Sequence, residues 1–120
     1  MIHAIIKEVG TAAFSEKEPL LILFDQSATA ALRNYSIIQE ITSEVAFSLQ
    51  IGDSISFDEQ EYLIEHIGPL ANDNLTTVGH STLIFGQQSE ENKIANGIYL
   101  SPYQLPKIKV GTKIVYKQVN

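Results

Sequence analysis

One short segment decides the fold, Ile64–Ala71 (IEHIGPLA). It repeats the pattern of an earlier segment, Ile6–Ala13 (IKEVGTAA), and both read Ile-x-x-(Val/Ile)-Gly-x-x-Ala at an offset of 58 residues. A hydrophobic stretch that ends at glycine is typical of a strand that leads into a tight bend, where a side chain would clash. The match indicates that the same structural unit occurs twice in the chain.

Two further matches occur in the same order. Leu21–Phe24 resembles Thr82–Phe85 at an offset of 61, and Gln50–Ile55 resembles Lys109–Ile114 at an offset of 59. We therefore interpret the 120 residues as a single domain of two pseudo-repeats, about 1–60 and 61–120. Neither half could bury its sheet face alone, so the strands of the two halves are expected to share one barrel.

The apolar residues fall in short clusters separated by turn residues, which is typical of strands. The expected strands are Ile2–Val9, Leu20–Phe24, Ser54–Phe57, Tyr62–Ile64, Thr82–Phe85 and Ile108–Val119. The expected fold is all-β, a closed or partly open antiparallel barrel. Helical structure is limited to short turns, at Gln26–Arg33 and Pro102–Pro106.

Composition excludes several classes of protein. With no cysteine, the chain has neither disulfides nor thiolate chemistry. No apolar run reaches the ~20 residues that span a bilayer, and the N-terminus lacks the pattern of a secretory signal, so we expect a cytoplasmic protein without direct membrane insertion. The net charge of −6 argues against nucleic acid as a partner. The lysines between Lys107 and Lys117 fit a solvated strand edge or a docking patch.

Enzyme signatures are missing as well. The sequence has no glycine-rich nucleotide loop and no nucleophile elbow, and its three histidines lack metal-ligand spacing, so no metal and no cofactor are expected. His3 and His66 fit surface or packing roles. His80 follows Gly79 and a turn-like stretch with Asn72 and Asn74. Imidazole suits reversible phosphoryl or proton transfer, but a Gly-His pair fits a structural role equally well.

The run Ile67–Phe85 (IGPLANDNLTTVGHSTLIF) adds a family resemblance. It resembles the segment typical of the glucitol/sorbitol-specific IIA components of the bacterial sugar phosphotransferase system, in which Val-Gly precedes an Asn-Leu and then Leu-Gly-His-x-Thr-Leu-x-Phe. Weaker agreement extends from Ile5 to Tyr116. The resemblance implies that the chain accepts a phosphoryl group from HPr and passes it to a IIB domain during sugar uptake through IIC. The candidate phosphoacceptor is His80, and the expected binding residues are Asn72, Asn74 and Gly79.

The sequence departs from the family pattern at one position. The resemblance puts the family's phosphoacceptor histidine four residues after the tyrosine that matches Tyr35, where this chain has Gln39. An amide cannot accept a phosphoryl group as imidazole does. One hypothesis is a phosphoryl carrier with His80, or else His66, as acceptor. The alternative is a IIA-like regulatory or binding module that has lost phosphotransfer. A third is a barrel that binds a small ligand unconnected with sugar transport.

Overall fold

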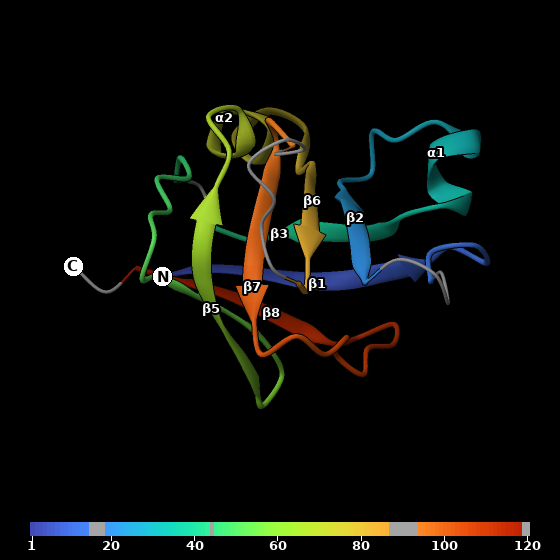
Figure 1. Cartoon of the computed structure of the whole chain (residues 1–120). Helices are drawn as coiled ribbons and strands as arrows, with labels where there is room; N and C mark the ends of the chain where they lie inside the picture. The colour runs from blue at the N-terminus through green and yellow to red at the C-terminus, as the bar shows by residue number, and fades with distance from the viewer. Residues whose placement is uncertain (15–18, 44, 87–93, 119–120) are drawn as a thin grey trace.

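The structure, a computed structural model, describes residues 1–14, 19–43, 45–86 and 94–118. In these ranges, strands close into a barrel and two short helices lie outside it (Figure 1). The elements are β1 (Ile2–Val9), β2 (Leu20–Phe24), α1 (Ala30–Asn34), β3 (Ile37–Ile41), β4 (Ser54–Phe57), β5 (Gln60–Ile67), α2 (Ala71–Val78), β6 (Ser81–Ile84), β7 (Gly97–Ser101) and β8 (Lys113–Lys117). The predicted β-barrel with only short helices is confirmed. The strands β3 and β7 were not expected.

Around the barrel the strands follow the order β1-β3-β2-β6-β7-β5-β4-β8. Most neighbours are antiparallel, as expected, but β2 with β3 and β6 with β7 are parallel. The purely antiparallel expectation was therefore wrong for these two pairs. Parallel neighbours need a long crossover rather than a hairpin, and residues 25–36, which include α1, provide one of the two crossovers.

Exchanging the two halves of the chain leaves this strand order unchanged, which agrees with two pseudo-repeats. The turns repeat too. The Gly52 N–H donates to the Ile64 carbonyl at 2.9 Å, and the Gly111 N–H donates to the Ile6 carbonyl at 2.8 Å. Equivalent turns thus tie β5 and β1 to the segments that precede β4 and β8.

One of the repeat matches needs a correction of one residue. The parallel ladders pair Leu23 with Ile37 and Leu83 with Ile98, so Leu23 corresponds to Leu83 at an offset of 60, not 61. Both leucines are fully buried, whereas Ile84 is only half-buried. A slip of one residue would turn the wrong side of the strand inward.

The barrel interior is filled by alternate residues of the strands. On β2, Leu21 and Leu23 are fully buried, and each such side chain contributes roughly 1.5–3 kcal/mol. On β3 the inward row includes Ile37 and then Gln39, which lies opposite the core residue Ile6. Gln39 is fully buried and thus places one polar side chain in an otherwise apolar row.

The bend after β5 has no room for a side chain at Gly68. An added Cβ would lie 2.2 Å from the Ala95 carbonyl oxygen, so Gly68→Ala is expected to lower the free energy of unfolding by about 3 kcal/mol, as severe overpacking does. Gly86→Ala is the control, because its Cβ would meet only Pro19 at 3.6 Å. Urea unfolding measures both, and equal losses would contradict the close approach at Gly68.

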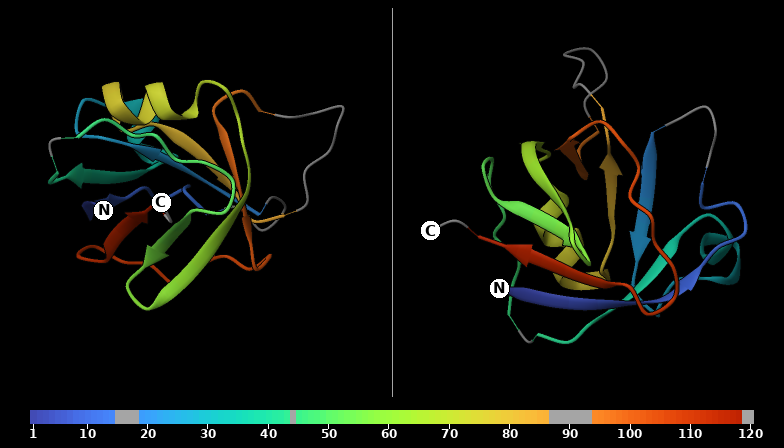
Figure 2. Two further views of the ribbon diagram at one scale, coloured as in Figure 1. Left: turned by 90° about the vertical axis from the view of Figure 1, so that its left-hand side faces the viewer. Right: turned by 90° about the horizontal axis from the view of Figure 1, so that it is seen from below.

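The turn-like stretch before His80 is in fact the helix α2, seen at the top of the barrel in Figure 1 and in the left view of Figure 2. Ala71 and Leu75, one helical turn apart, are fully buried against the barrel. Asp73 lies in the first turn, where a carboxylate favours the helix dipole. The turn-forming residues were therefore misread as a loop, because Ala71 and Leu75 are the only apolar anchors of this helix's core face.

The other expected helical stretches differ in extent. The stretch Gln26–Arg33 becomes helix α1 only from Ala30, with Thr29 as its N-cap, and Pro102–Pro106 contains no helix. None of the helices that can be described is long and apolar enough to cross a membrane.

Candidate functional site

Gln39 is held at both ends of its amide. Its Nε2 donates to the Gly79 carbonyl at 3.0 Å, and its Oε1 accepts from the Tyr116 hydroxyl at 2.5 Å. A carbonyl can only accept, so the NH₂ group must face Gly79, and the hydroxyl must donate to the oxygen. Gln39 therefore joins β3 to the end of α2 and to β8 by two buried hydrogen bonds.

Tyr116 is the least expected member of this group. Burial raises the pKa of its hydroxyl well above the usual 10. The ring also meets Phe47 edge-on, with centroids 4.9 Å apart. The only sequence signal for Tyr116 was its inward position in an alternating strand, which says nothing of its partner.

Gly79 ends α2 in the left-handed conformation, with φ +60°. Its position is also tight, because an added Cβ would lie 2.8 Å from the Asp25 Cβ. Glycine is thus required twice, by the dihedral angle and by the close approach of the loop after β2. The turn presents the Gly79 carbonyl to Gln39 and directs the next residue, His80, outward along β6.

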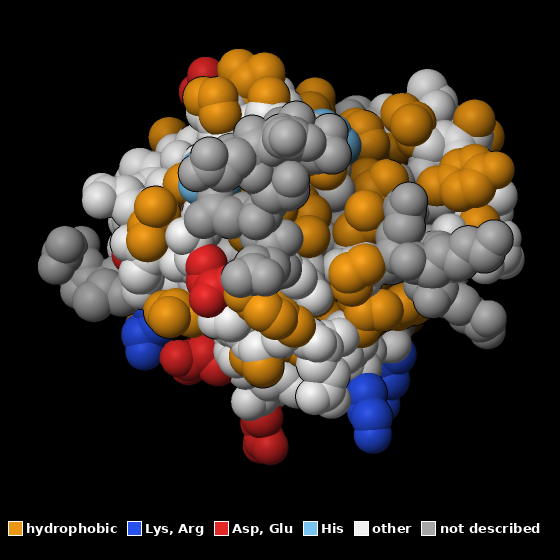
Figure 3. Space-filling model, in the orientation of Figure 1, with side chains coloured by type: hydrophobic (Ala, Val, Ile, Leu, Met, Phe, Trp, Pro, Cys, Tyr) orange, Lys and Arg blue, Asp and Glu red, His pale blue; other side chains and the backbone are white. Residues whose placement is uncertain are grey.

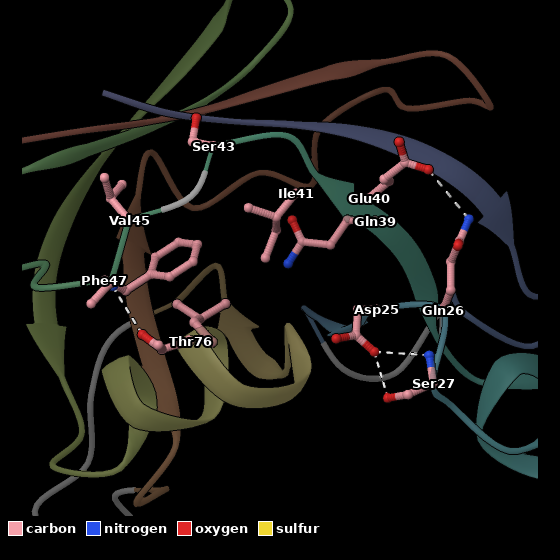
Figure 4. A pocket seen from close by; sticks show the side chains of 12 residues that line it. Asp25, Gln26, Ser27, Gln39, Glu40, Ile41, Ser43, Val45, Phe47 and Thr76 are labelled. Atoms are coloured by element: carbon pink, nitrogen blue, oxygen red, sulfur yellow. Dashed lines mark hydrogen bonds between the residues drawn. The ribbon is translucent and has the colours of Figure 1, made fainter.

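Gln39 lies in the wall of a pocket of about 610 Å³ (Figure 4). The lining residues are Asp25, Gln26, Ser27, Gln39, Glu40, Ile41, Ser43, Val45, Ala46, Phe47, Leu75 and Thr76. They include two carboxylates and no cationic side chain. Lys7 approaches Glu40 to 3.9 Å, but both side chains are about half exposed, so this ion pair is weak. The described lining of the pocket is therefore net negative.

Asn72 does not face this pocket but holds the segment that leads to β4. Its Oδ1 accepts from the Leu49 N–H at 2.8 Å, and its Nδ2 donates to the Leu49 carbonyl at 3.0 Å. One turn later, the Thr76 hydroxyl accepts from the Phe47 N–H at 2.9 Å. The two side chains on α2 thus fix the segment that carries Phe47 and Leu49 into the core.

Asn72→Ala is expected to lower the free energy of unfolding by about 2 kcal/mol, because it leaves two Leu49 backbone groups without partners. The matched control is Asn74→Ala on the same helix, for which a change within about 0.5 kcal/mol is expected, since no hydrogen bond of its side chain is found in the described part of the chain. Thermal or urea unfolding measures both, and equal losses would contradict the role of Asn72.

His80 is half-buried, and both of its ring nitrogens are hydrogen-bonded. Nδ1 lies 3.0 Å from the Leu23 carbonyl oxygen, and Nε2 lies 2.6 Å from the Asn96 Nδ2. Because the carbonyl can only accept, Nδ1 carries the proton and Nε2 accepts from the amide. The ring stacks on Phe24 with centroids 4.1 Å apart.

The structure brings together three of the residues singled out in the sequence. Gln39 and His80 lie on either side of Gly79, joined to it by a hydrogen bond and by the chain itself. Asn72 lies at the start of α2 and bonds Leu49 instead, while the Asn74 carbonyl accepts from the His80 N–H at 3.2 Å. His66 is half-buried and meets the Tyr99 ring edge-on, at a centroid distance of 5.5 Å.

Asn96 and Phe24 were not among the predicted site residues. In the sequence, Asn96-Gly97 carries only the general signal of a turn, and Phe24 is only the end of an apolar run. In the part of the chain that the structure describes, no group of three or more metal-ligating side chains comes together.

Comparison with known proteins agrees with the resemblance in the sequence. The family described as "PTS system glucitol/sorbitol-specific IIA component" matches residues 1–115. The glucitol/sorbitol-specific EIIA component of Escherichia coli is 31% identical over 86 residues, which cover 71% of this chain and 69% of that protein. The crystal structure of a PTS system IIA component from Enterococcus faecalis superposes with a TM-score of 0.91 at 38% identity, covering 97% of this chain and 99% of that one. The chain therefore belongs to the glucitol/sorbitol-specific IIA family of the sugar phosphotransferase system.

Proposed function

We propose that this chain is a single-domain, cytoplasmic IIA component that takes a phosphoryl group from HPr and passes it to a IIB domain, with His80 Nε2 as the acceptor atom. The observation that carries the proposal is the hydrogen bond from Nδ1–H to the Leu23 carbonyl. It fixes the neutral tautomer that leaves the lone pair on Nε2, and a lone pair on nitrogen is what attacks phosphorus.

The composition of the chain supports a histidine acceptor. It has three histidines and no cysteine, so an imidazole is the available nucleophile for reversible phosphoryl transfer. His3 is exposed near the terminus, and His66 packs beside Tyr99. Of the three, His80 is the one whose ring is oriented by two hydrogen bonds and an aromatic stack.

The surface around His80 is suited to binding a partner protein, because it is apolar. Phe24, on which the ring stacks, lies on the outer face of β2 with Leu20 and Ile22, all half-buried, and Ile84 continues this face onto β6. Figure 3 shows hydrophobic side chains gathered over this side of the barrel. An apolar surface beside the acceptor gives a partner protein area to bury around the reacting atoms.

In the transfer step, His80 Nε2 attacks the phosphorus of phospho-HPr. A P–N bond forms at His80 while the P–N bond to the donor imidazole breaks, and the donor keeps the electron pair. The proton stays on Nδ1 and is donated to the Leu23 carbonyl oxygen, which stabilises the positive charge that the phosphorylated ring carries. Transfer to IIB runs the same chemistry in the opposite sense.

The test is incubation with phosphoenolpyruvate, enzyme I and HPr, followed by mass spectrometry for an acid-labile, base-stable phosphoryl group. Wild type and His66→Asn are expected to carry one group, and His80→Asn is expected to carry none. Label that survives in His80→Asn would reject His80 as the acceptor. Circular dichroism checks that each variant is folded.

A second candidate, a IIA-like binding module without phosphotransfer, would rest on Gln39 alone. This residue stands where the resemblance puts the family's phosphoacceptor, and both ends of its amide are already hydrogen-bonded. The pocket beside it carries the carboxylates of Asp25 and Glu40, which repel a phosphoryl group. An unlabelled wild type in the same assay, with HPr labelled, would select this candidate over the first.

A further inference from the structure

The nitrogen that would accept phosphate is already covered. His80 Nε2 lies 2.6 Å from the Asn96 Nδ2, a short distance for a hydrogen bond between two nitrogens. Since Nδ1 carries the ring proton, the Asn96 amide must donate to Nε2. The lone pair that attacks phosphorus is therefore engaged in the resting protein.

Asn96 is itself held in place by the strand that follows His80. Its carbonyl accepts from the Ser81 hydroxyl at 3.0 Å and from the Thr82 N–H at 3.3 Å. Asn96 is half-buried and immediately precedes β7, which pairs with β6. The main chain of Asn96 is thus fixed to the residues next to His80, so only rotation about its side-chain χ angles would move the amide away from Nε2.

We propose that Asn96 is a reversible cap on His80. In the resting protein its amide donates to Nε2 and keeps the ring unreactive, and in the phosphorylated protein the same NH₂ group donates to a phosphoryl oxygen. This inference rests on the proposed function, because it assigns a second residue to the same acceptor. One lone pair cannot accept an N–H and form a P–N bond at once, so the amide must swing aside before transfer. Docking of the partner supplies that change, which restricts transfer to the bound complex.

The cap can be tested without any partner protein. Diethylpyrocarbonate carbethoxylates a free imidazole lone pair, and peptide mapping by mass spectrometry reads His80 separately from His3 and His66. Asn96→Ala removes the amide, so His80 should react about 3- to 10-fold faster than in wild type, the range expected for losing one hydrogen bond. The carboxylate of Asn96→Asp can only accept a hydrogen bond, so Nε2 must carry a proton to bond with it. His80 should therefore react more slowly with the reagent than in wild type.

A spectroscopic measurement complements the reactivity. In the wild type at neutral pH, two-dimensional ¹⁵N–¹H spectra of the histidine rings should show His80 as the Nδ1–H tautomer. In Asn96→Asp, both ring nitrogens should show the shifts of an imidazolium. A merely structural role for Asn96 would change neither the tautomer nor the charge of the ring.

The outcomes separate the cap from the proposed function. Equal carbethoxylation of His80 in wild type and Asn96→Ala would overturn the cap, and so would an Nε2–H tautomer in the wild type, whatever the folding of the variants. A wild type that reacts as expected with diethylpyrocarbonate but takes no label from phospho-HPr would reject the proposed function and leave the hydrogen bond established. If the cap and the proposed function both hold, Asn96→Ala should also be phosphorylated by a small donor such as phosphoramidate, and the capped wild type should be phosphorylated more slowly.

Discussion

Gln39→Glu is expected to lower the free energy of unfolding by about 3 to 4 kcal/mol at pH 7 and by far less near pH 4. The side chain is fully buried, and its NH₂ group faces the Gly79 carbonyl. An ionised carboxylate there would point an anionic oxygen at a carbonyl oxygen. A protonated carboxyl would keep both bonds, with O–H donated to Gly79 and the other oxygen accepting from Tyr116.

The direction of the pH dependence follows from the raised pKa of this carboxyl. Burial without a cation raises the folded-state pKa of a glutamate by about 3 to 5 units above its unfolded value of ~4.3. The folded protein then binds the proton more tightly than the unfolded chain does. The stabilising effect is fully present below the unfolded pKa and is lost as the pH rises through the folded pKa.

Urea unfolding of the variant and the wild type from pH 4 to pH 7 measures the effect as the difference between the two proteins. The matched control is Gln104→Glu, the same chemical change on an exposed side chain, which should stay within about 0.5 kcal/mol of wild type throughout. A Gln39→Glu difference that does not vary with pH would contradict the buried contact with Gly79.

The fold was largely predictable because its strands carry strong local signals. Two such signals are the apolar alternation at Ser54–Phe57 and the glycine bends at Gly10 and Gly68. They depend only on neighbours in the sequence, and all of them are present in the barrel. The two parallel strand pairs could not be predicted from the sequence, because the relative direction of two neighbouring strands depends on where the segment that connects them packs. β3 escaped detection since Ile37–Ile41 (IIQEI) lacks alternation in an isolated five-residue run.

The site was less predictable, because its contacts join residues far apart in the chain. Gln39 bonds Tyr116 and Gly79, and His80 bonds Leu23 and Asn96. Each side chain fits several environments, and only the closed barrel selects among them. The sequence could therefore name Gln39 and His80 but could not indicate that both are already engaged by partners.

The His80→Asn variant is expected to take no phosphoryl group. Adding Gln39→His to that variant is expected to restore labelling, now at residue 39. The resemblance puts the family's phosphoacceptor histidine at this position. The Gly79 carbonyl, which now accepts from the Gln39 amide, would accept one ring N–H and leave the lone pair on the other nitrogen. The pocket beside residue 39 would admit the incoming phosphoryl group.

The carboxylates of Asp25 and Glu40 should limit the rate of this new acceptor. Repulsion between unit charges near a protein surface is worth about 1 kcal/mol or more at contact distance, so neutralising each carboxylate as Asp25→Asn and Glu40→Gln should speed labelling several-fold. Added salt should speed the carboxylate-bearing protein more than the neutralised one, because ions screen exposed charges. Labelling by enzyme I, HPr and phosphoenolpyruvate, followed by mass spectrometry, measures both rates. If Gln39→His stays unlabelled even with both carboxylates neutralised, a histidine at position 39 is not sufficient for phosphotransfer and the prediction is wrong.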